Sequence, residues 1–322
     1  ICLTVDYTKL IIKKSVLIIY LTFLRSSLTR VTAQSCCNTM QIPFMKLSGA
    51  GNDFVIIDNR QDLLPLPPVK LAEKVCRRRL SIGADGLLLV ELSAKADFKM
   101  RYFNADGSEA ETCGNGARCI AQFAYLNGIV PADMHFETQA GLYSAEITGD
   151  QVKVRLSDPT RGRLSFPLQL TAEVCEVSFV NTGVPHIISL VSNLETVNLV
   201  GLGREIRNHD NFAPAGTNVN FIQIKGDRKI EIRTYERGVE DETLACGTGS
   251  VAAAIIAALL GEVTPPVAVT TASGTVLTVY FDFFNSCLSD EMGKEIQVTN
   301  VHLEGDARLV CQGQLTSSAW NY

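Results

Sequence analysis

The chain has 322 residues, of which 46% are hydrophobic, so it can build the cores of one large or two medium-sized domains. Its formal net charge of −5 gives no reason to expect a nucleic acid or a membrane as a partner. Ten cysteines are too few for a disulfide-stapled secreted domain, and no Cys-x-x-Cys pair or histidine cluster predicts a metal site. We expect mostly reduced cysteines and a cytoplasmic protein.

The two ends of the chain differ from the rest. Residues 1–39 carry five basic side chains and one acidic side chain, and their apolar run at 16–24 is too short to span a bilayer. We interpret residues 1–40 as a disordered leader or a non-native extension, with Met40 as the true start in the second case. A transit peptide would direct the protein to a plastid. Residues 315–322 are expected to be a disordered tail.

Between these ends the pattern predicts mostly strands. In the first part, strands are expected at residues 43–58, 86–91, 98–103 and 136–156, and helices at 69–79 and from Cys113 onward. In the second part, strands are expected at 176–192, 219–236 and 266–284, a polar stretch at 201–218, and a helix from Gly247. Residues 159–167 are predicted to be a linker, and residues 301–313 a final strand pair.

Two short stretches are copies of each other, and each carries one cysteine. Residues 113–116 read Cys-Gly-Asn-Gly, and residues 246–249 read Cys-Gly-Thr-Gly. The match extends downstream to glycines 15 and 28 residues after each cysteine, and upstream to Asn52 and His186, which each follow a glycine by three residues. The chain is therefore predicted to contain a duplicated domain, with one cysteine from each copy beside a shared cleft.

The second cysteine leads a run, residues 251–260, that is apolar on every face, which is typical of a buried helix. At about ten residues this run is too short to cross a membrane. Because helices do not alternate regularly with strands, a Rossmann pattern is excluded. We expect an α+β fold in which each half wraps a sheet around one buried helix.

The position of these cysteines predicts acid/base chemistry. A cysteine just before a Gly-rich helix start lies beside backbone N–H groups that have no partner within the helix. The helix dipole should lower the pKa of the thiol, and the same N–H groups can hold a carboxylate. Two such thiols on opposite faces of one substrate can invert a carbon stereocentre, since one removes a proton and the other returns it.

Several motifs together resemble the diaminopimelate epimerase family. They are Lys46 to Phe54 (KLSGAGNDF), Asn104 to Cys119 (NADGSEAETCGNGARC), Gly183 to His186 (GVPH), Asn218 to Phe221 (NVNF), Tyr235 to Gly238 (YERG) and Glu242 to Gly249 (ETLACGTG). These segments lie within residues 41–314, which are nearly all of the chain beyond the leader.

The resemblance implies two pseudo-symmetric lobes, each a mostly antiparallel β-barrel around a central helix, with the active site in the cleft between them. Residues 41–158 and 298–314 would form the first lobe, and residues 159–297 the second. The implied reaction converts LL-2,6-diaminopimelate into the meso form, for lysine and peptidoglycan precursor synthesis. It needs no pyridoxal phosphate, other cofactor or metal. The resemblance is also compatible with a homodimer.

The resemblance also implies roles for individual residues. The catalytic residues would be Cys113 and Cys246 as the acid/base thiols, assisted by His186 and Glu236, which orient the substrate amine. The substrate would be bound by Asn52, Asn104, Asn218 and Arg237, and by the backbone N–H groups of Gly114, Asn115, Gly247 and Thr248. The planar guanidinium of Arg237 suits the distal carboxylate.

Three alternatives stay open at this stage. A proline or hydroxyproline racemase would share the fold and the paired cysteines, but it would have no use for Asn104, Asn218 and Arg237 at a charged distal end. A phenazine-type isomerase would lack thiol chemistry. A thiol redox protein would use Cys113 and Cys246 as a switch disulfide. Gly86 and Val184 stand where several family members carry Gln and Asn, which leaves a different amino-acid substrate open.

Overall fold

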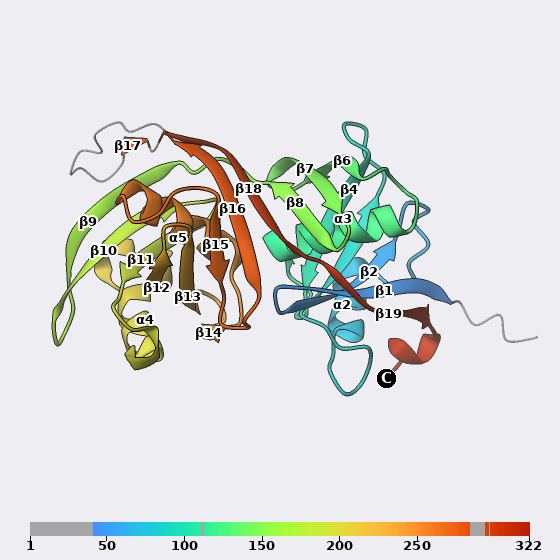
Figure 1. Ribbon diagram of the computed structural model, residues 1–322. Coiled ribbons are helices and arrows are strands. Elements are labelled where there is room, and N and C mark those ends of the chain that lie inside the picture. Colours follow the sequence, from blue (N-terminus) through green and yellow to red (C-terminus); the bar gives the residue numbers. More distant parts are fainter. Residues whose placement is uncertain (1–40, 111–112, 284–293, 296) are drawn as a thin grey trace, which may run out of the picture. The chain divides into compact units, whose positions relative to one another are not determined.

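The computed structural model describes residues 41–110, 113–283, 294–295 and 297–322 (Figure 1). The predicted leader, residues 1–40, lies outside the described residues. The first half comprises β1 (Ile42–Gly49), β2 (Asn52–Asp58), α2 (Pro68–Val75), β3 (Gly86–Glu91), β4 (Phe98–Asn104), β5 (Glu109–Ala110), α3 (Gly114–Leu126), β6 (Asp133–Thr138), β7 (Gly141–Thr148) and β8 (Gln151–Arg155). The predicted strands and the helix after Cys113 are therefore confirmed.

The second half repeats this order and adds a final strand pair. It comprises β9 (Arg161–Gln169), β10 (Val174–Asn181), β11 (Pro185–Leu190), η1 (Leu194–Thr196), α4 (Leu199–Arg207), η2 (Asp210–Phe212), β12 (Asn218–Gly226), β13 (Lys229–Glu236), β14 (Asp241–Thr243), α5 (Gly247–Leu259), β15 (Val267–Thr270), β16 (Val276–Phe283), β17 (Lys294–Glu295), β18 (Val298–Asp306), β19 (Arg308–Leu315) and η3 (Ser317–Ala319).

The strand pairings show the duplication directly. β1–β2 and β10–β11 are antiparallel, β2–β3 and β11–β12 are parallel, and β3–β4 and β12–β13 are antiparallel. β4–β6 and β13–β15 are again parallel, and β6–β7 and β15–β16 antiparallel. The two halves thus have the same strand arrangement, and the predicted α+β class is confirmed.

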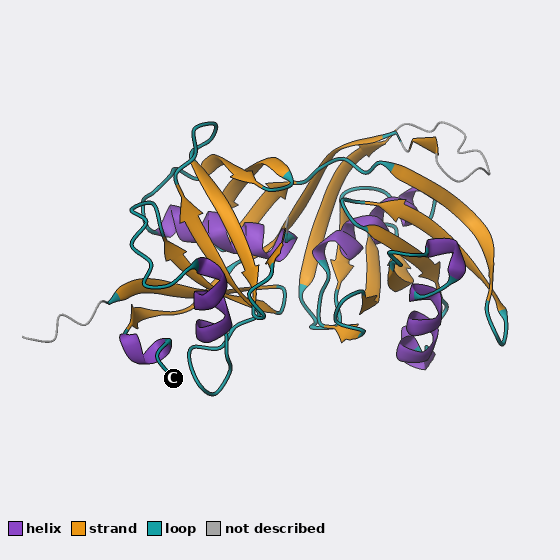
Figure 2. Ribbon diagram, turned by 180° about the vertical axis from the view of Figure 1, so that it is seen from behind, coloured by secondary structure: helices purple, strands orange, loops and turns teal. Residues whose placement is uncertain are grey.

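The long helices α3 and α5 occupy equivalent places in the two halves. Strands β1, β2, β3, β4, β7 and β8 pack against α3, and strands β10 to β13, β15 and β16 pack against α5 (Figure 2). Val251 to Ala258 are all buried, which confirms the prediction from the all-apolar pattern. The Gly-rich N-termini of α3 and α5 therefore have equivalent positions in the two halves.

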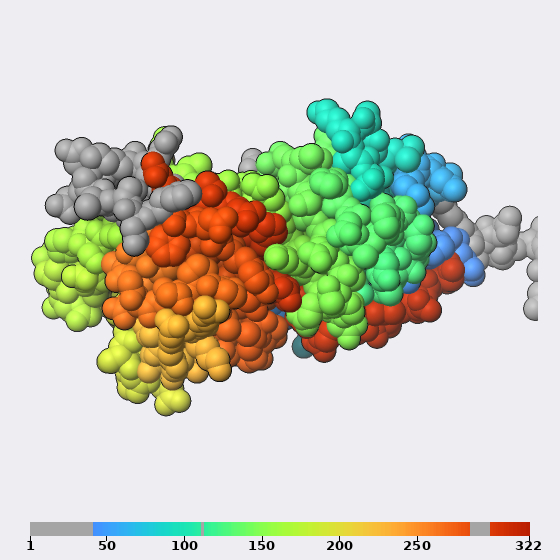
Figure 3. Space-filling model, turned by 45° about the horizontal axis from the view of Figure 1, so that its top comes forward, coloured from blue at the N-terminus to red at the C-terminus, as the bar shows by residue number. Residues whose placement is uncertain are grey.

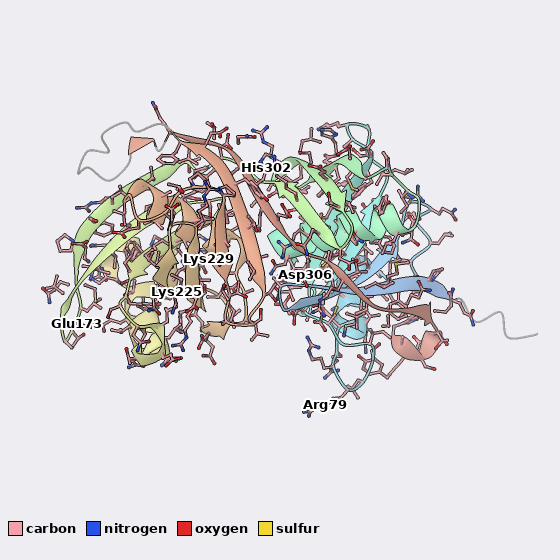
Figure 4. All side chains as sticks on the ribbon, viewed as in Figure 1. Arg79, Glu173, Lys225, Lys229, His302 and Asp306 are labelled. Carbon is pink, nitrogen blue, oxygen red and sulfur yellow. The ribbon has the colours of Figure 1, made fainter. Side chains whose placement is uncertain are left out.

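Strand β18 joins the two halves. Its residues pair with β16 on one side and with β8 on the other, and in Figure 3 its red atoms lie between the orange and green atoms of those regions. The following strand, β19, pairs with β1. Asp306, at the end of β18 (Figure 4), accepts a hydrogen bond of 3.1 Å from the backbone N–H of Ala50. The C-terminal strands thus return to the first half of the chain.

The predicted linker at residues 159–167 is wrong, because most of it forms β9. This strand pairs with β10 along most of its length. Gly162, Phe166 and Leu168 are buried, and the residues between them are exposed or half-buried. The period-two burial of these side chains outweighs the Pro and Gly that suggested a linker.

The predicted polar stretch at residues 201–218 hides a helix. α4 starts after Asn198, whose side chain accepts a hydrogen bond of 3.2 Å from the backbone N–H of Gly201. Its buried residues, Leu199, Gly203 and Ile206, lie on one face at helical spacing. Three small or apolar positions among charged ones were sufficient for an amphipathic helix, although the composition looked like a loop.

The tail is not a disordered end. Trp320 is buried in a cluster with Leu71 and Val75 of α2, and the hydroxyl of Ser81 donates to the carbonyl of Ala319 over 2.9 Å. The Tyr322 hydroxyl donates to the carbonyl of Lys74 over 2.7 Å. The single tryptophan of the chain anchors this segment, which the polar residues around it did not reveal.

Candidate active site

Both cysteines of the duplicated motif cap a helix. Cys113 is the N-cap of α3 and Cys246 the N-cap of α5, and both have extended backbone conformations. The Cys113 Sγ atom accepts a hydrogen bond of 3.3 Å from the backbone N–H of Gly116. The Cys246 Sγ atom lies 3.5 Å from the Oγ1 atom of Thr248. The sequence prediction that each cysteine opens a helix is therefore confirmed.

The two helix starts meet. A Cβ atom on Gly247 would lie 3.7 Å from the Cα atom of Gly114 and 3.2 Å from the Cδ2 atom of Leu303 on β18. A Cβ atom on Gly114 would lie 3.4 Å from the same Leu303 atom. The first N–H groups of a helix have no partner within it, so two sets of free donors converge here. Such a pair of helix starts is suited to a carboxylate.

Burial raises the pKa values of both thiols. For Cys113 the Glu236 carboxylate adds to the effect of burial, whereas the N–H of Gly116 and the charge of Arg118 oppose it. For Cys246 the Glu236 carboxylate again adds to burial, and Thr248 opposes it. The expected lowering of the thiol pKa is wrong, because desolvation by burial outweighs the favourable N–H contacts.

Glu236 stands at the end of β13, where its charge acts on both thiols. Burial raises the pKa of its carboxyl group. The structure thus brings Glu236, Cys113 and Cys246 into one site, where the Glu236 carboxylate favours the protonated form of both thiols. A positively charged group arriving between them would reverse this effect.

His186 is fully buried at the start of β11. Its Nε2 atom lies 3.0 Å from the Thr248 Oγ1 atom, and its Nδ1 atom lies 3.1 Å from the Nδ2 atom of Asn220. Burial lowers the pKa of His186 to about 3, so the ring is neutral at physiological pH. Both ring nitrogens are bonded to protein groups, and His186 reaches Cys246 only through Thr248.

Asn52 supports the start of α3. The Asn115 side chain donates to the Asn52 Oδ1 atom over 2.6 Å, and the Asn52 amide donates to Asp85 over 3.0 Å. On the other side, the fully buried Arg118 donates to the Asn115 Oδ1 atom over 2.8 Å. Asn52 therefore positions Asn115. In the other half, the equivalent contact is the one between His186 and Thr248.

Two of the three residues expected to bind the distal end of a substrate, Asn218 and Arg237, are in contact. The buried Asn218 accepts a hydrogen bond of 2.8 Å from the backbone N–H of Arg237. The Arg237 Nη1 atom donates weakly to the carbonyl of Ala215, at 3.4 Å. Asn104 lies in the first half, and its amide is bonded to Ser108 in its own turn over 3.0 Å.

Residues that the sequence reasoning missed include the Thr248 hydroxyl, Asn220 and Arg118. Asn220 had a detectable signal, since Asn218 and Asn220 alternate with the apolar Val219 and Phe221 and so face the same side of the strand. Arg118 also had one, as a charged residue within a buried helix. The hydroxyl of Thr248 had none, because its contact depends on a strand more than sixty residues away.

The described residues contain neither a metal-binding cluster nor a membrane-spanning helix. Within this part of the chain, no three His, Cys, Asp or Glu side chains are grouped as they would be to hold a metal ion. In the same part, no helix has the length and apolar character needed to cross a membrane.

Comparison with known proteins agrees with this geometry. The sequence profile of the family described as "Diaminopimelate epimerase" matches residues 44–161 and 178–295, one segment in each half. The chain belongs to the diaminopimelate epimerase family. The diaminopimelate epimerase of Aquifex aeolicus is 44% identical over 291 residues, covering 87% of this chain and 99% of that protein. That of Chlorobaculum tepidum is 46% identical over 274 residues, covering 84% and 100%.

Solved structures show that this family shares its fold with others. A probable proline racemase from Agrobacterium radiobacter K84 matches with a TM-score of 0.64 at 14% identity, covering 87% of this chain and 94% of that one. A phenazine biosynthesis protein of the PhzF family from Bacillus anthracis matches with a TM-score of 0.62 at 18% identity, covering 86% and 99%. At such low identity the likeness concerns the fold alone.

Proposed function

We propose that this chain epimerises LL-2,6-diaminopimelate to the meso form without a cofactor, using Cys113 and Cys246 as the two acid/base groups. The observation that carries the proposal is the meeting of two matched helix starts, each capped by a cysteine. Relatives named as diaminopimelate epimerases match nearly their whole length. The lysine and peptidoglycan precursor pathways are where this reaction belongs.

The reacting carboxylate would bind between the two helix starts. The N–H groups of Gly114, Asn115, Gly247 and Thr248 supply donors there, and both helix dipoles favour an anion. Bound in this way, the α-carbon would lie between the two thiols. Glu236 would hold the α-ammonium group, because its carboxylate acts on both thiols and faces the same space.

The reaction would then proceed by one proton removed and one returned. The thiolate on one face takes the α-proton, and the C–H bonding pair stays on carbon as a carbanion. The thiol on the other face gives its proton to that carbon, and the configuration is inverted. A desolvated thiolate is a stronger base than one in water, so the burial that raises the pKa values of both thiols favours the proton transfer once the ammonium group has arrived.

The distal amino-acid end would be bound by Asn104, Asn218 and Arg237. The contact between the Asn218 side chain and the Arg237 backbone supports this, since it fixes the strand end from which the guanidinium projects. A guanidinium has five N–H donors, and among the described residues that of Arg237 makes one weak hydrogen bond, to the carbonyl of Ala215. Arg237 can therefore pair with a carboxylate.

The proposal extends to organisation and location. The lobes would be residues 41–158 with 298–314, and residues 159–297, which the pairing of β19 with β1 supports. The thiols need a reducing compartment, so a cytoplasmic protein is proposed, with a homodimer as its assembly. A plastid location would depend on residues 1–40, which lie outside the described part of the chain.

The test is a side-by-side assay of substrates. Purified protein is given LL-diaminopimelate, lysine, proline and 4-hydroxyproline in deuterated water, and α-deuterium and stereochemistry are followed by NMR and chiral chromatography. The proposal predicts that diaminopimelate is converted with the highest kcat/KM. Faster conversion of proline or hydroxyproline would instead support the racemase alternative, and conversion of none of them would overturn the proposal.

A further inference from the structure

Four side chains form one line of hydrogen bonds that ends at the Cys246 sulfur. The Thr234 hydroxyl donates to Asn220 Oδ1 over 3.0 Å, and Asn220 Nδ2 lies 3.1 Å from His186 Nδ1. His186 Nε2 lies 3.0 Å from Thr248 Oγ1, which lies 3.5 Å from Cys246 Sγ. The three residues deepest in the line, Thr234, Asn220 and His186, are buried. Water therefore has little access to these bonds.

The direction of the line is set by one backbone carbonyl. Asn220 Nδ2 also lies 3.0 Å from the carbonyl oxygen of Ile187, which can only accept a hydrogen bond. The amide nitrogen of Asn220 must therefore face Ile187 and His186, while its oxygen receives the Thr234 hydroxyl. The third residue of α5, Gly249, packs directly on this amide, since a Cβ atom there would come within 2.5 Å of Asn220 Oδ1.

This orientation fixes the tautomer of His186. A donating amide at Nδ1 requires a lone pair there, so the ring proton is on Nε2 and is donated to Thr248 Oγ1. The Thr248 hydroxyl then has its own hydrogen free for Cys246. Every donor in the line points toward the sulfur.

The charges around the line leave the ring neutral. Burial, and to a lesser extent the Arg237 charge, lower the pKa of His186. Facing Cys246 are Glu236 and Cys113, which disfavour its thiolate together with burial, and Thr248 and the N–H of Gly249, which favour it. The hydroxyl of Thr248 is thus one of two groups that offset an otherwise unfavourable environment for the thiolate.

We propose that Asn220 is a positioning residue that fixes the Nε2–H tautomer of His186 and thereby makes Thr248 an obligatory hydrogen-bond donor to the Cys246 thiolate. The inference rests on the proposed function, because it states how one of the two bases of that reaction is held in its reactive form. In the other half, Asn115 occupies the position of Thr248, but its side-chain amide donates to Asn52. The Cys113 sulfur is bonded to a backbone N–H instead. The hydroxyl relay is therefore specific to Cys246.

The first experiment reads the tautomer in the full chain without substrate. Long-range proton–nitrogen NMR correlations on the ¹⁵N-labelled protein distinguish an Nε2–H ring from an Nδ1–H ring, and the His186→Gln variant assigns the signals. The parent protein should show an Nε2–H ring at position 186. In Asn220→Asp, the carboxylate accepts from Nδ1 and should move the proton there, so that Nε2 becomes an acceptor. A ring proton on Nδ1 of His186 in the parent would overturn the proposed direction of the hydrogen bonds toward Cys246.

The second experiment reads the thiols. Alkylation by iodoacetamide is followed against pH, and Cys113 and Cys246 are quantified separately by mass spectrometry. Loss of a hydrogen bond to a charged sulfur should raise the apparent pKa of Cys246 by about one to two pH units in Asn220→Asp and in Thr248→Val, and leave Cys113 unchanged. Thr248→Ser, which keeps the hydroxyl, should behave like the parent.

The double variant separates positioning from general damage. In a Thr248→Val background, Asn220→Asp should cause no further shift for Cys246, since the hydroxyl through which it acts is gone. Additive shifts, or equal shifts for both cysteines, would overturn the proposal. If Asn220→Asp does not fold, the parent tautomer and the comparison of Thr248→Val with Thr248→Ser still decide it. None of these readouts needs substrate, so failure of the parent to epimerise diaminopimelate would count against the proposed function only.

Discussion

Gly114 and Gly247 begin helices α3 and α5 and lie so close that a Cβ atom on Gly247 would be 3.7 Å from the Cα atom of Gly114. This contact brings both cysteine-capped helix starts, and the N–H groups of their first turns, to one point. The glycines permit this approach because they have no side chain to separate the helix ends. The duplicated fold is thus arranged around a contact between its two copies.

A methyl group at this contact should impair activity far more than stability. Gly247→Ala would place its Cβ atom 3.2 Å from Leu303 Cδ2 and 3.4 Å from Asn115 Oδ1, both of which can give way slightly. A displacement of reacting groups on the ångström scale can cost about 100-fold in rate. We expect a loss of about that size in kcat/KM with only a small fall in Tm. Gly114→Ala would place its Cβ atom 3.4 Å from the same Leu303 atom and 4.0 Å from the Cα atom of Gly247, so it should lose less. Parent-like kcat/KM in Gly247→Ala would contradict the importance of this contact.

Glu236 should reduce stability while serving the reaction. Its pKa is raised in the folded protein, so the folded state binds its proton more tightly than the unfolded chain. This destabilisation is absent at a pH below the pKa that Glu236 has in the unfolded chain. It develops as the pH rises through the pKa of Glu236 in the folded protein, and it persists above that pKa. Glu236→Gln should therefore have a higher Tm than the parent at pH 8, and this gain should shrink toward pH 5.

The same variant should lose about 100-fold or more in kcat, as expected for a group that holds the reacting ammonium. The matched control is Glu173→Gln, at the exposed turn between β9 and β10 (Figure 4), which should change neither Tm nor kcat. A lower Tm for Glu236→Gln at pH 8 would contradict the argument from burial.

Some secondary-structure elements and site residues could be predicted from the sequence and others could not, depending on how clearly the residue pattern reports burial. β3 was predicted with its correct bounds, and the burial of α5 was predicted, because continuous apolar runs report burial directly. β9 and α4 were mistaken for a linker and a polar stretch, since their few buried positions were hidden among Pro, Gly and charged residues. The cysteines were found through the internal repeat. The role of the Thr248 hydroxyl was not, because it arises from a contact with a distant strand. Asn220 was overlooked, although its alternation with Asn218 was a usable signal.

The C-terminal segment should contribute to stability without affecting catalysis. Trp320 is 5% exposed and packs on α2, far along the chain from the cysteines. Trp320→Ala should lower the free energy of unfolding by about 3–5 kcal/mol, as for other buried aromatic side chains. Urea denaturation measures this change, and kcat of the folded fraction should equal that of the parent. A variant as stable as the parent would mean that the segment is not docked in solution.

Arg237 should determine which substrate is accepted. Removing the partner of a desolvated carboxylate costs roughly 2–5 kcal/mol, or on the order of 30- to 1000-fold or more. Arg237→Ala should reduce kcat/KM for diaminopimelate by about that factor, whereas Arg237→Lys, which keeps the charge but lacks the two-pronged geometry, should lose less. Substrates without a distal carboxylate should be poor for the parent and almost unaffected by either change. Comparable losses for lysine and diaminopimelate would place Arg237 elsewhere in the reaction.

The central claim is that two separate thiols serve the two faces of one carbon, and isotope exchange at early times tests it most directly. The parent protein is given LL-diaminopimelate in deuterated water, and the α-deuterium content of product and remaining substrate is measured before a tenth of the substrate has reacted. A thiol holds one exchangeable proton, so the proton removed by one thiol stays there while the other thiol delivers deuterium from solvent. The account predicts that the meso product carries deuterium at its inverted α-carbon and that the remaining substrate is unlabelled. Cys113→Ala and Cys246→Ala should show no epimerisation. Product that retains the substrate's own α-proton, or full activity in either variant, would contradict it.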